Sequence, residues 1–196
     1  MQPLKIIHYP HPTLRHKSKA ITRVDAQLKE IIDTMFKLMY EAKGIGLAAN
    51  QVDLPLRLFI INLKGDPEEG EERVFINPVI SRPKGQAEAD EGCLSIPQVN
   101  GTVLRPLKIH VSAYDIAGNE IDETVDGLLA RAIQHEADHL DGVLFFDRMS
   151  DTSKKTIDGL LYEFETEHNA MVKSGELPDA ETNARRLAEI EAKYCS

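Results

Sequence analysis

The sequence predicts a domain that mixes α-helices with β-strands, and three segments carry this prediction. Residues 25–42 repeat apolar side chains at the i, i+3, i+4 and i+7 spacing of an amphipathic helix. Residues 108–125 contain an alternating strand, a turn at 117–119 and a second strand, which is typical of a β-hairpin. Residues 127–141 return to a helical spacing of apolar side chains. A length of 196 residues suits one domain with a substantial core.

The segments around these three extend the same mixture. Residues 56–63 form an apolar run typical of a buried strand, and residues 74–80 predict a shorter strand broken at Pro78. The first 24 residues are irregular, and we expect their histidines, His8, His11 and His16, to be surface or packing side chains rather than ligands. Residues 151–196 predict two amphipathic helices with a break at 174–178. This tail carries no motif, so we expect it to pack or to form an interface.

Composition narrows the classes of protein that remain. The net charge of −9 and the pI near 5.3 argue against a protein whose main partner is a phosphate backbone. No apolar run reaches the length of a membrane span, and the first residues lack the long apolar core of a secretory signal. The two cysteines, Cys93 and Cys195, do not make a disulfide framework. We therefore expect a cytoplasmic protein.

The strongest chemical pattern is the sequence HEADH at 135–139. Two histidines four residues apart lie on one face of a helix, where both imidazoles can bind one divalent metal ion. Glu136 between them can then move a proton from a water at that ion. Asp126 is a candidate N-cap and Gly142 a candidate stop for this helix. The alternative is a solvated charged face on an ordinary helix, because short patterns recur by chance.

A catalytic metal site usually has three protein ligands, so a third ligand is needed. The pattern HExxHxxGxxH fails, because Phe145 stands where its third histidine would be. A thermolysin-like site would take a downstream glutamate, and Glu163 and Glu167 have suitable spacing on a predicted helix. Cys93 is the other candidate, since a thiolate is a strong ligand for a borderline-soft metal ion. The residues alone leave both candidates open.

Three motifs in order resemble the signature motifs of peptide deformylases: GIGLAANQ at 44–51, EGCLS at 91–95 and QHEADHLDG at 134–142. The likeness covers roughly residues 3–150. It implies an α+β fold with mixed, mainly antiparallel sheets packed around a central metal-binding helix, followed by a C-terminal helical tail. In these terms, residues 1–170 would form the catalytic domain and residues 171–196 a C-terminal helical extension of it.

The same resemblance implies a metal centre and a reaction. Cys93, His135 and His139 would hold one divalent metal ion per chain, with Fe2+ in the cell and Zn2+, Ni2+ or Co2+ able to substitute. The reaction would remove the N-formyl group from the formylmethionine of newly made polypeptides and release formate. Glu136 would transfer the proton. Gln51, through its side chain, and Leu94, through its backbone N–H, would stabilise the oxyanion.

The resemblance also implies how the substrate is held and what the partners are. Four residues would contact the peptide: Ile45, Gly46, Leu128 and Arg131. Arg131 is polar where some relatives are apolar, while Gln134 and Asp138 are candidates to support the metal ligands. We expect formylmethionyl nascent peptides as partners, at the ribosome exit, without specific nucleic-acid readout or membrane binding, and a monomer or weak homodimer.

The residues also leave two rival functions possible. The first is an HExxH metallopeptidase that uses a downstream glutamate as its third ligand. The second is a non-enzymatic metal-binding or interaction protein on the same scaffold. Loss of Glu136, Gln51 or Cys93 would favour the second rival, and all three are present.

Overall fold

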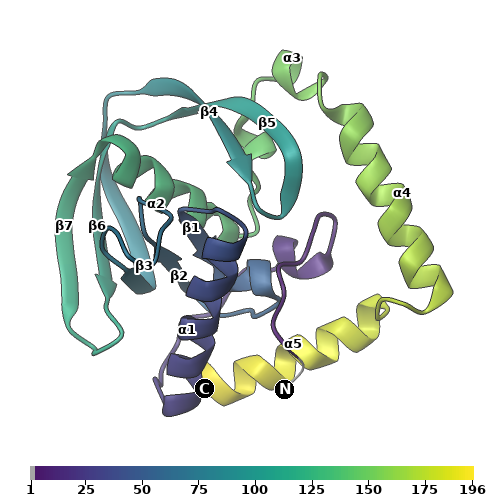
Figure 1. Cartoon of the computed structure of the whole chain (residues 1–196), viewed down its shortest axis with the longest axis horizontal. Helices are drawn as coiled ribbons and strands as arrows, with labels where there is room; N and C mark the ends of the chain where they lie inside the picture. The colour runs from purple at the N-terminus through teal and green to yellow at the C-terminus, as the bar shows by residue number, and fades with distance from the viewer. Residues whose placement is uncertain (1–2) are drawn as a thin grey trace.

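The computed structural model describes residues 3–196 and arranges five α-helices around two antiparallel β-sheets (Figure 1). The larger sheet has the order β1-β2-β3-β6-β7, and the smaller sheet is the β4–β5 hairpin. The strands are β1 (Gly46–Ala48), β2 (Leu58–Ile61), β3 (Arg73–Lys84), β4 (Ala87–Cys93), β5 (Ile96–Arg105), β6 (Lys108–Tyr114) and β7 (Glu120–Asp126). The α-helices are α1 (Ala26–Glu41), α2 (Gly127–Leu140), α3 (Asp151–Lys154), α4 (Asp158–Ser174) and α5 (Ala180–Tyr194). This arrangement confirms the predicted α+β fold with a central helix and a helical tail.

The larger sheet separates two hydrophobic clusters, and β2 contributes to both. Successive side chains of a strand point to opposite faces of the sheet. Leu58 and Ile60 accordingly join the cluster around α1, whereas Phe59 and Ile61 join the cluster around α2. All four are buried, which explains why this strand is continuously apolar rather than alternating.

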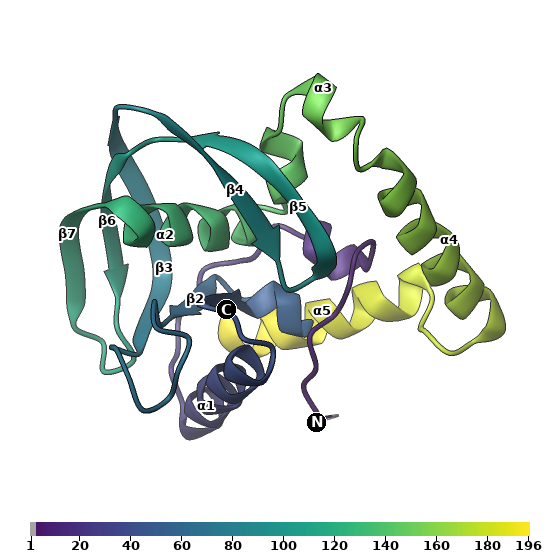
Figure 2. The same cartoon turned by 45° about the horizontal axis from the view of Figure 1, so that its top comes forward.

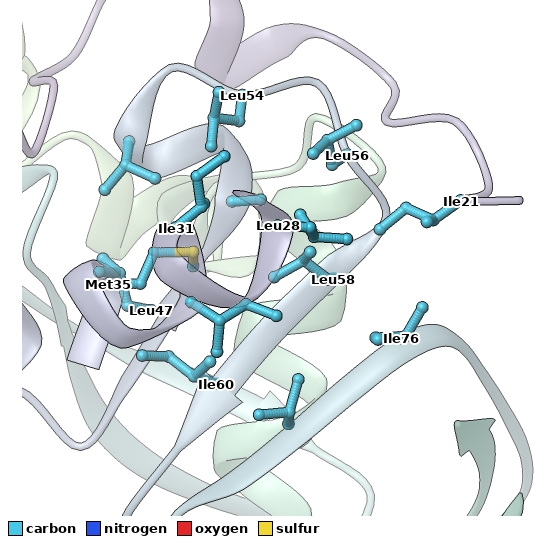
Figure 3. Close-up of a cluster of buried hydrophobic side chains, with 14 of the residues drawn as sticks. Ile21, Leu28, Ile31, Met35, Leu47, Leu54, Leu56, Leu58, Ile60 and Ile76 are labelled. Atoms are coloured by element: carbon cyan, nitrogen blue, oxygen red, sulfur yellow. The ribbon is translucent and has the colours of Figure 1, made fainter. Parts of the chain in front are cut away.

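Helix α1 covers one face of the larger sheet, as its apolar spacing predicts. Its N-cap is Asp25, whose Oδ1 accepts a hydrogen bond from the backbone N–H of Leu28 at 2.8 Å. Such a cap contributes about 1 kcal/mol to stability. Figure 3 shows the apolar face of this helix, including Ile31 and Met35, directed at the side chains of the strands.

Helix α2 covers the opposite face of the sheet. Ala130, Ile133, Ala137 and Leu140 recur at helical spacing and are buried in the cluster that contains Phe59. Figure 2 shows this helix crossing beneath the β4–β5 hairpin, so its other side faces that hairpin. The helix is therefore enclosed between the two sheets.

The start of α2 differs in one detail from the expectation. Asp126 is the N-cap residue and has an extended backbone, but its side chain makes no capping hydrogen bond. Its carboxylate instead forms an ion pair with Lys108, at 3.1 Å between Nζ and Oδ2. The residue was correctly placed by sequence, whereas the interaction of its side chain was not.

Two parts of the sheets depart from the sequence prediction. Strand β3 continues beyond residue 80, because it stays paired with β6 as far as Lys84. The register of this pairing shifts between Ile76 and Val79 and again between Ser81 and Lys84. Prolines are tolerated at such irregularities, and Pro78 and Pro83 lie within them. The β4–β5 hairpin was not predicted as such, since the segment AEADEGC lacks an apolar alternation.

The tail contains the two predicted helices, and the break between them lies at Gly175, whose φ of 83° ends α4. Figure 1 shows α4 running along one side of the molecule and α5 returning towards α1. Tyr194 at the end of α5 is buried in the α1 cluster. Within residues 3–196, no helix combines the length and apolar character needed to cross a membrane.

Candidate metal centre and catalytic site

Three side chains from two elements converge beneath the β4–β5 hairpin. The ligand atoms of Cys93, His135 and His139 all lie within 4.8 Å of one another. The Cys93 Sγ and His139 Nε2 atoms are 3.2 Å apart. Glu163 and Glu167 do not belong to this group and lie exposed on α4. The structure thus places Cys93, the thiolate candidate, beside the two histidines. It gives no support to a downstream glutamate as the third ligand.

Local structure explains how these three side chains meet. His135 and His139 are four residues apart on α2, and their rings lie with centroids 5.0 Å apart. Cys93 ends β4, directly after a register shift in the pairing of β4 with β5. Irregularities of this kind commonly re-aim a side chain beside an active site. The N-terminal histidines do not belong to this group: His8 lines the neighbouring cavity, His11 is buried and His16 pairs with Glu191.

The surroundings of His135 suit a cation. Its Nδ1 lies 3.0 Å from Glu91 Oε2, which leaves Nε2 free to act as a ligand. Burial alone lowers the pKa of His135, but Cys93 and Glu91 raise it more, to about 10. Burial, by contrast, holds the pKa of His139 well below its ordinary value, so this ring is neutral and able to act as a ligand. A thiol and two imidazoles form a donor set that fits a single divalent metal ion.

A buried ionic network stands behind His135. Arg105 is only 2% exposed and donates to Glu91 from Nε at 2.6 Å and from Nη2 at 2.8 Å. Its Nη1 donates to Asp138 Oδ2 at 2.7 Å, and Arg148 also binds Asp138. Burial raises the pKa of Glu91, but the hydrogen bonds from Arg105 and His135 lower it by more. The net result is a pKa well below the usual range of a glutamate. Sequence reasoning assigned no role to Glu91 or Arg105.

Glu136 reaches the same place from α2. It is buried, and burial raises the pKa of its carboxyl group to about 7. Its Oε2 has no hydrogen-bond partner among residues 3–196. A side chain at Gly46 would collide with the other carboxylate oxygen, so only glycine allows this close approach. An unpaired, buried carboxylate oxygen beside the three ligand side chains is placed to accept a proton.

The amide of Gln51 lies against the thiol. Its Oε1 accepts a hydrogen bond from the backbone N–H of Ala48 at 2.8 Å. Its Nε2 donates to Cys93 Sγ at 3.4 Å and to Ser95 Oγ at 3.2 Å. Ser95 was quoted in the motif EGCLS but was given no role by the sequence. The burial of Ser95 and the contact of its hydroxyl with the Gln51 amide become visible only in the folded chain.

A cavity of about 670 Å³ opens onto these groups. Every residue expected to act on or contact the substrate lines it: Ile45, Gly46, Gln51, Leu94, Leu128, Arg131 and Glu136. Leu128 is 54% exposed. The Arg131 guanidinium is occupied, since it donates to Glu91 Oε1 at 2.6 Å and to the Ala87 carbonyl at 2.7 Å. Arg131 thus also ties α2 to β4.

Gln134 and Asp138, the two candidate supporting residues, have different positions. Asp138 belongs to the network through Arg105. Gln134 instead donates to the carbonyls of Pro106 at 3.0 Å and Ala130 at 2.9 Å, so it joins α2 to the connection between β5 and β6. Only Asp138 is connected to a metal-ligand candidate, through Arg105 and Glu91.

Comparisons with known proteins agree with this geometry. A family model described as polypeptide deformylase matches residues 3–155. The peptide deformylase of Rhodopirellula baltica is 51% identical over 192 residues, which cover 98% of this chain and 96% of that protein. The peptide deformylase of Maricaulis maris is 45% identical over 147 residues, or 74% of this chain and 84% of that protein.

Solved structures lead to the same assignment. The crystal structure of the plant peptide deformylase PDF1B has a TM-score of 0.85 at 42% identity, over 92% of this chain and 97% of that chain. Because a family model covers most of the sequence and a relative matches nearly all of it, the chain belongs to the polypeptide deformylase family, metallohydrolases that deformylate N-formylmethionine peptides.

Proposed function

We propose that this chain removes the formyl group from newly made polypeptides at a metal ion held by Cys93, His135 and His139. The observation that carries the proposal is the convergence of these three ligand atoms within 4.8 Å, in a group beside the cavity that Glu136 lines. A thiolate and two imidazoles are ligands that suit first-row transition metals. We propose Fe2+ as the ion used in the cell, with Zn2+, Ni2+ or Co2+ able to replace it.

When bound by Cys93, His135 and His139, the ion would lower the pKa of a water towards neutral and would polarise the carbonyl group. The chain supplies the proton transfer. Glu136, whose buried Oε2 has no hydrogen-bond partner among residues 3–196, would accept the proton of the attacking water and deliver it to the departing amine. Glu91 accepts a hydrogen bond from Nδ1 of His135 and so fixes the ring orientation, which leaves Nε2 as the atom that would bind the ion.

Two donors from the chain stabilise the oxyanion in this proposal. One is the Gln51 amide, and the other is the backbone N–H of Leu94; both residues line the cavity next to Cys93. Loss of one such donor costs about 3–4 kcal/mol of transition-state stabilisation. The chain that follows α1 also approaches this point, because a Cβ at Gly44 would lie 2.6 Å from Leu94 Cδ1. The reacting carbonyl is thereby surrounded on several sides.

The extended peptide binds beside β1 in this proposal. Strand β1 is an edge of the larger sheet, and Gly46 at its start lines the cavity together with the preceding Ile45. An edge strand offers unpaired backbone groups, and pairing through them tolerates many sequences. The methionine side chain enters between Leu128 and the aliphatic part of Arg131, whose charged end is held by Glu91.

The wider context is also part of the proposal. We infer formylmethionyl nascent peptides at the ribosome exit as substrates, a cytoplasmic location, a monomer or weak homodimer, and no specific readout of nucleic acid. The net charge of −9 supports the last point. We keep residues 1–170 as the catalytic domain and residues 171–196 as an extension, although α4 runs without interruption through position 170.

Release of the free amino terminus from matched formyl-Met and acetyl-Met peptides tests the function, with protein prepared anaerobically and loaded with iron; the acid released is formate from the first peptide and acetate from the second. The crowded carbonyl site should reject the acetyl methyl group, because a misplacement of about 1 Å can cost a hundredfold in rate. We therefore expect a specificity-constant ratio of about 100 or more in favour of the formyl peptide. A ratio near one would contradict the proposal and indicate a general amidase. Parallel zinc, nickel and cobalt preparations test the choice of metal.

A further inference from the structure

The proposed function needs the Gln51 amide in one orientation, and the structure shows how it is held. The Oε1 atom is fixed by the backbone N–H of Ala48 at 2.8 Å, which prevents an exchange of the oxygen and nitrogen positions. One anchor of this kind still leaves the amide free to turn about its last side-chain bond. The second anchor is Ser95 Oγ, 3.2 Å from Nε2.

Ser95 is placed to act as a rigid second anchor. Its side chain is fully buried, and its backbone carbonyl accepts a hydrogen bond from Tyr9 N–H at 2.9 Å. The neighbouring Ile7 N–H donates to the Gln51 carbonyl, also at 2.9 Å. The short segment from Ile7 to Tyr9 therefore binds the backbones of both residues and fixes the separation between them.

We propose that Ser95 is a positioning residue for deformylation, acting through Gln51. An amide nitrogen carries two N–H donors in a planar, fixed fork. When Ser95 Oγ accepts one of them, the other must point away from it, towards Cys93 Sγ, which lies 3.4 Å from Nε2 on the cavity side. In the structure this second N–H donates to Cys93 Sγ, and it is the one that the oxyanion would take as its donor when substrate binds. This inference rests on the proposed role of Gln51.

The alternative is that Ser95 only satisfies a buried amide and contributes to stability. The two roles differ in what they predict for turnover. A structural serine would change the free energy of unfolding with little effect on the folded enzyme. A positioning serine would change the rate of the chemical step, because the donor is aimed at the transition state rather than at the bound substrate.

The test compares Ser95→Ala, Gln51→Ala and the double variant in the iron-loaded enzyme, with Ser18→Ala as a matched control. Ser18 is also a buried serine, and it does not line the cavity. For Ser95→Ala we expect kcat to fall by about 10- to 100-fold with KM within about twofold, as for a misdirected donor. The double variant should be no slower than Gln51→Ala, whereas Ser18→Ala should retain wild-type kcat.

Two further measurements separate failure of this inference from failure of the proposed function. Metal content should stay at that of the wild type in Ser95→Ala. The second measurement is a 1H–15N spectrum of metal-free protein, in which the Gln51 side-chain amide signals are assigned by their loss in Gln51→Ala. These signals should broaden or shift in Ser95→Ala. Unchanged kcat and unchanged signals in Ser95→Ala, or additive losses in the double variant, would overturn the inference. A Gln51→Ala enzyme with wild-type kcat would instead overturn the proposed oxyanion role.

Discussion

Helices α2 and α5 are similar in length and in amphipathic character, yet their buried polar side chains have opposite surroundings. On α5, Asn183 donates to Thr13 Oγ1 at 3.3 Å, and Glu191 pairs with His16 at 2.7 Å and Lys19 at 2.6 Å. On α2, both Glu136 Oε2 and His139 Nδ1 lack a partner among residues 3–196. The polar side chains named on α5 are thus paired, whereas these two atoms on α2 are not.

This difference shows how buried polarity separates structure from chemistry. Buried polar atoms usually have hydrogen-bond partners, so an exception calls for an explanation. An unpaired atom alone is not sufficient, because the Tyr194 hydroxyl on α5 is also unpaired. Tyr194 lies in a hydrophobic cluster, whereas Glu136 lines a cavity beside three candidate metal ligands. The combination of an unpaired atom and a cavity identifies the reactive helix.

Replacing Glu136 by glutamine should have the largest effect on activity. The variant keeps the shape of the side chain and all three ligands but removes proton transfer, which contributes about 10²- to 10⁴-fold to rate. We expect formate release to fall by about that factor with wild-type metal content. Both quantities are measured on the same preparation.

The matched control is Glu191→Gln, which removes a buried carboxylate from α5. We expect this enzyme to release formate at the wild-type rate below its melting temperature, because Glu191 does not line the cavity. If metal and activity were lost together in Glu136→Gln, the role of Glu136 would be structural and the contrast between the helices would disappear.

Arg105→Met should have the largest effect on stability. It removes the buried guanidinium that Glu91 and Asp138 share and leaves them with Arg131 and Arg148, and removal of one partner from a buried ionic network costs about 3–5 kcal/mol. The free energy of unfolding is measured by urea titration. The control on α5 is Arg186→Met, whose partner Asp53 is 26% exposed and whose loss should cost about 0–1 kcal/mol. Equal losses in the two variants would show that burial of the network does not matter.

Removal of residues 171–196 should lower stability and leave the chemistry intact. The deletion exposes the sites of Leu187 and Tyr194, and a buried apolar side chain contributes about 1.5–3 kcal/mol. Since the tail no longer has to be ordered, we expect a net loss of about 2–4 kcal/mol. Thermal melting and formate release at 15 °C check this. A folded, metal-containing but inactive truncation would show that the tail reaches the site.

Local patterns predicted most of the helices, and they predicted less of the sheets. The apolar spacing of α1 and α2 follows from one face packed on the sheet, and β2 is apolar because both its faces are buried. The β4–β5 hairpin escaped prediction because three consecutive β4 residues, 88–90, are exposed, so the strand has little apolar signal. The two strands of this hairpin are held together by backbone pairing, which local side-chain patterns do not reveal.

The candidate site divides in the same way. Family motifs led to Cys93, Gln51 and the histidines, and these do lie together. Glu91 and Arg105 were missed because a buried ion pair and a solvated one look alike in sequence. Glu91 meets His135 from a position 44 residues away, and only the fold brings them into contact.

Glu191→Gln should have the smallest effect and one that depends on pH. Burial raises the pKa of Glu191, but hydrogen bonds from Lys19 and His16 lower it more, so the net shift is downward. A carboxyl group whose pKa is lowered on folding stabilises the protein above its unfolded pKa of about 4.3, and this stabilisation is lost as the pH falls through the folded value. The variant should therefore melt about 2 °C below wild type at pH 7, with the gap closing below about pH 4.

Glu189→Gln is the control for this pH dependence, because Glu189 is exposed on the same helix and forms no ion pair among residues 3–196. Its melting temperature should match that of wild type at both pH values. A Glu191→Gln gap that persisted unchanged at acidic pH would mean that the side chain acts through its shape rather than its charge. The α5 carboxylate would then differ from Glu136 in kind, since the proposed role of Glu136 depends entirely on gaining and losing a proton.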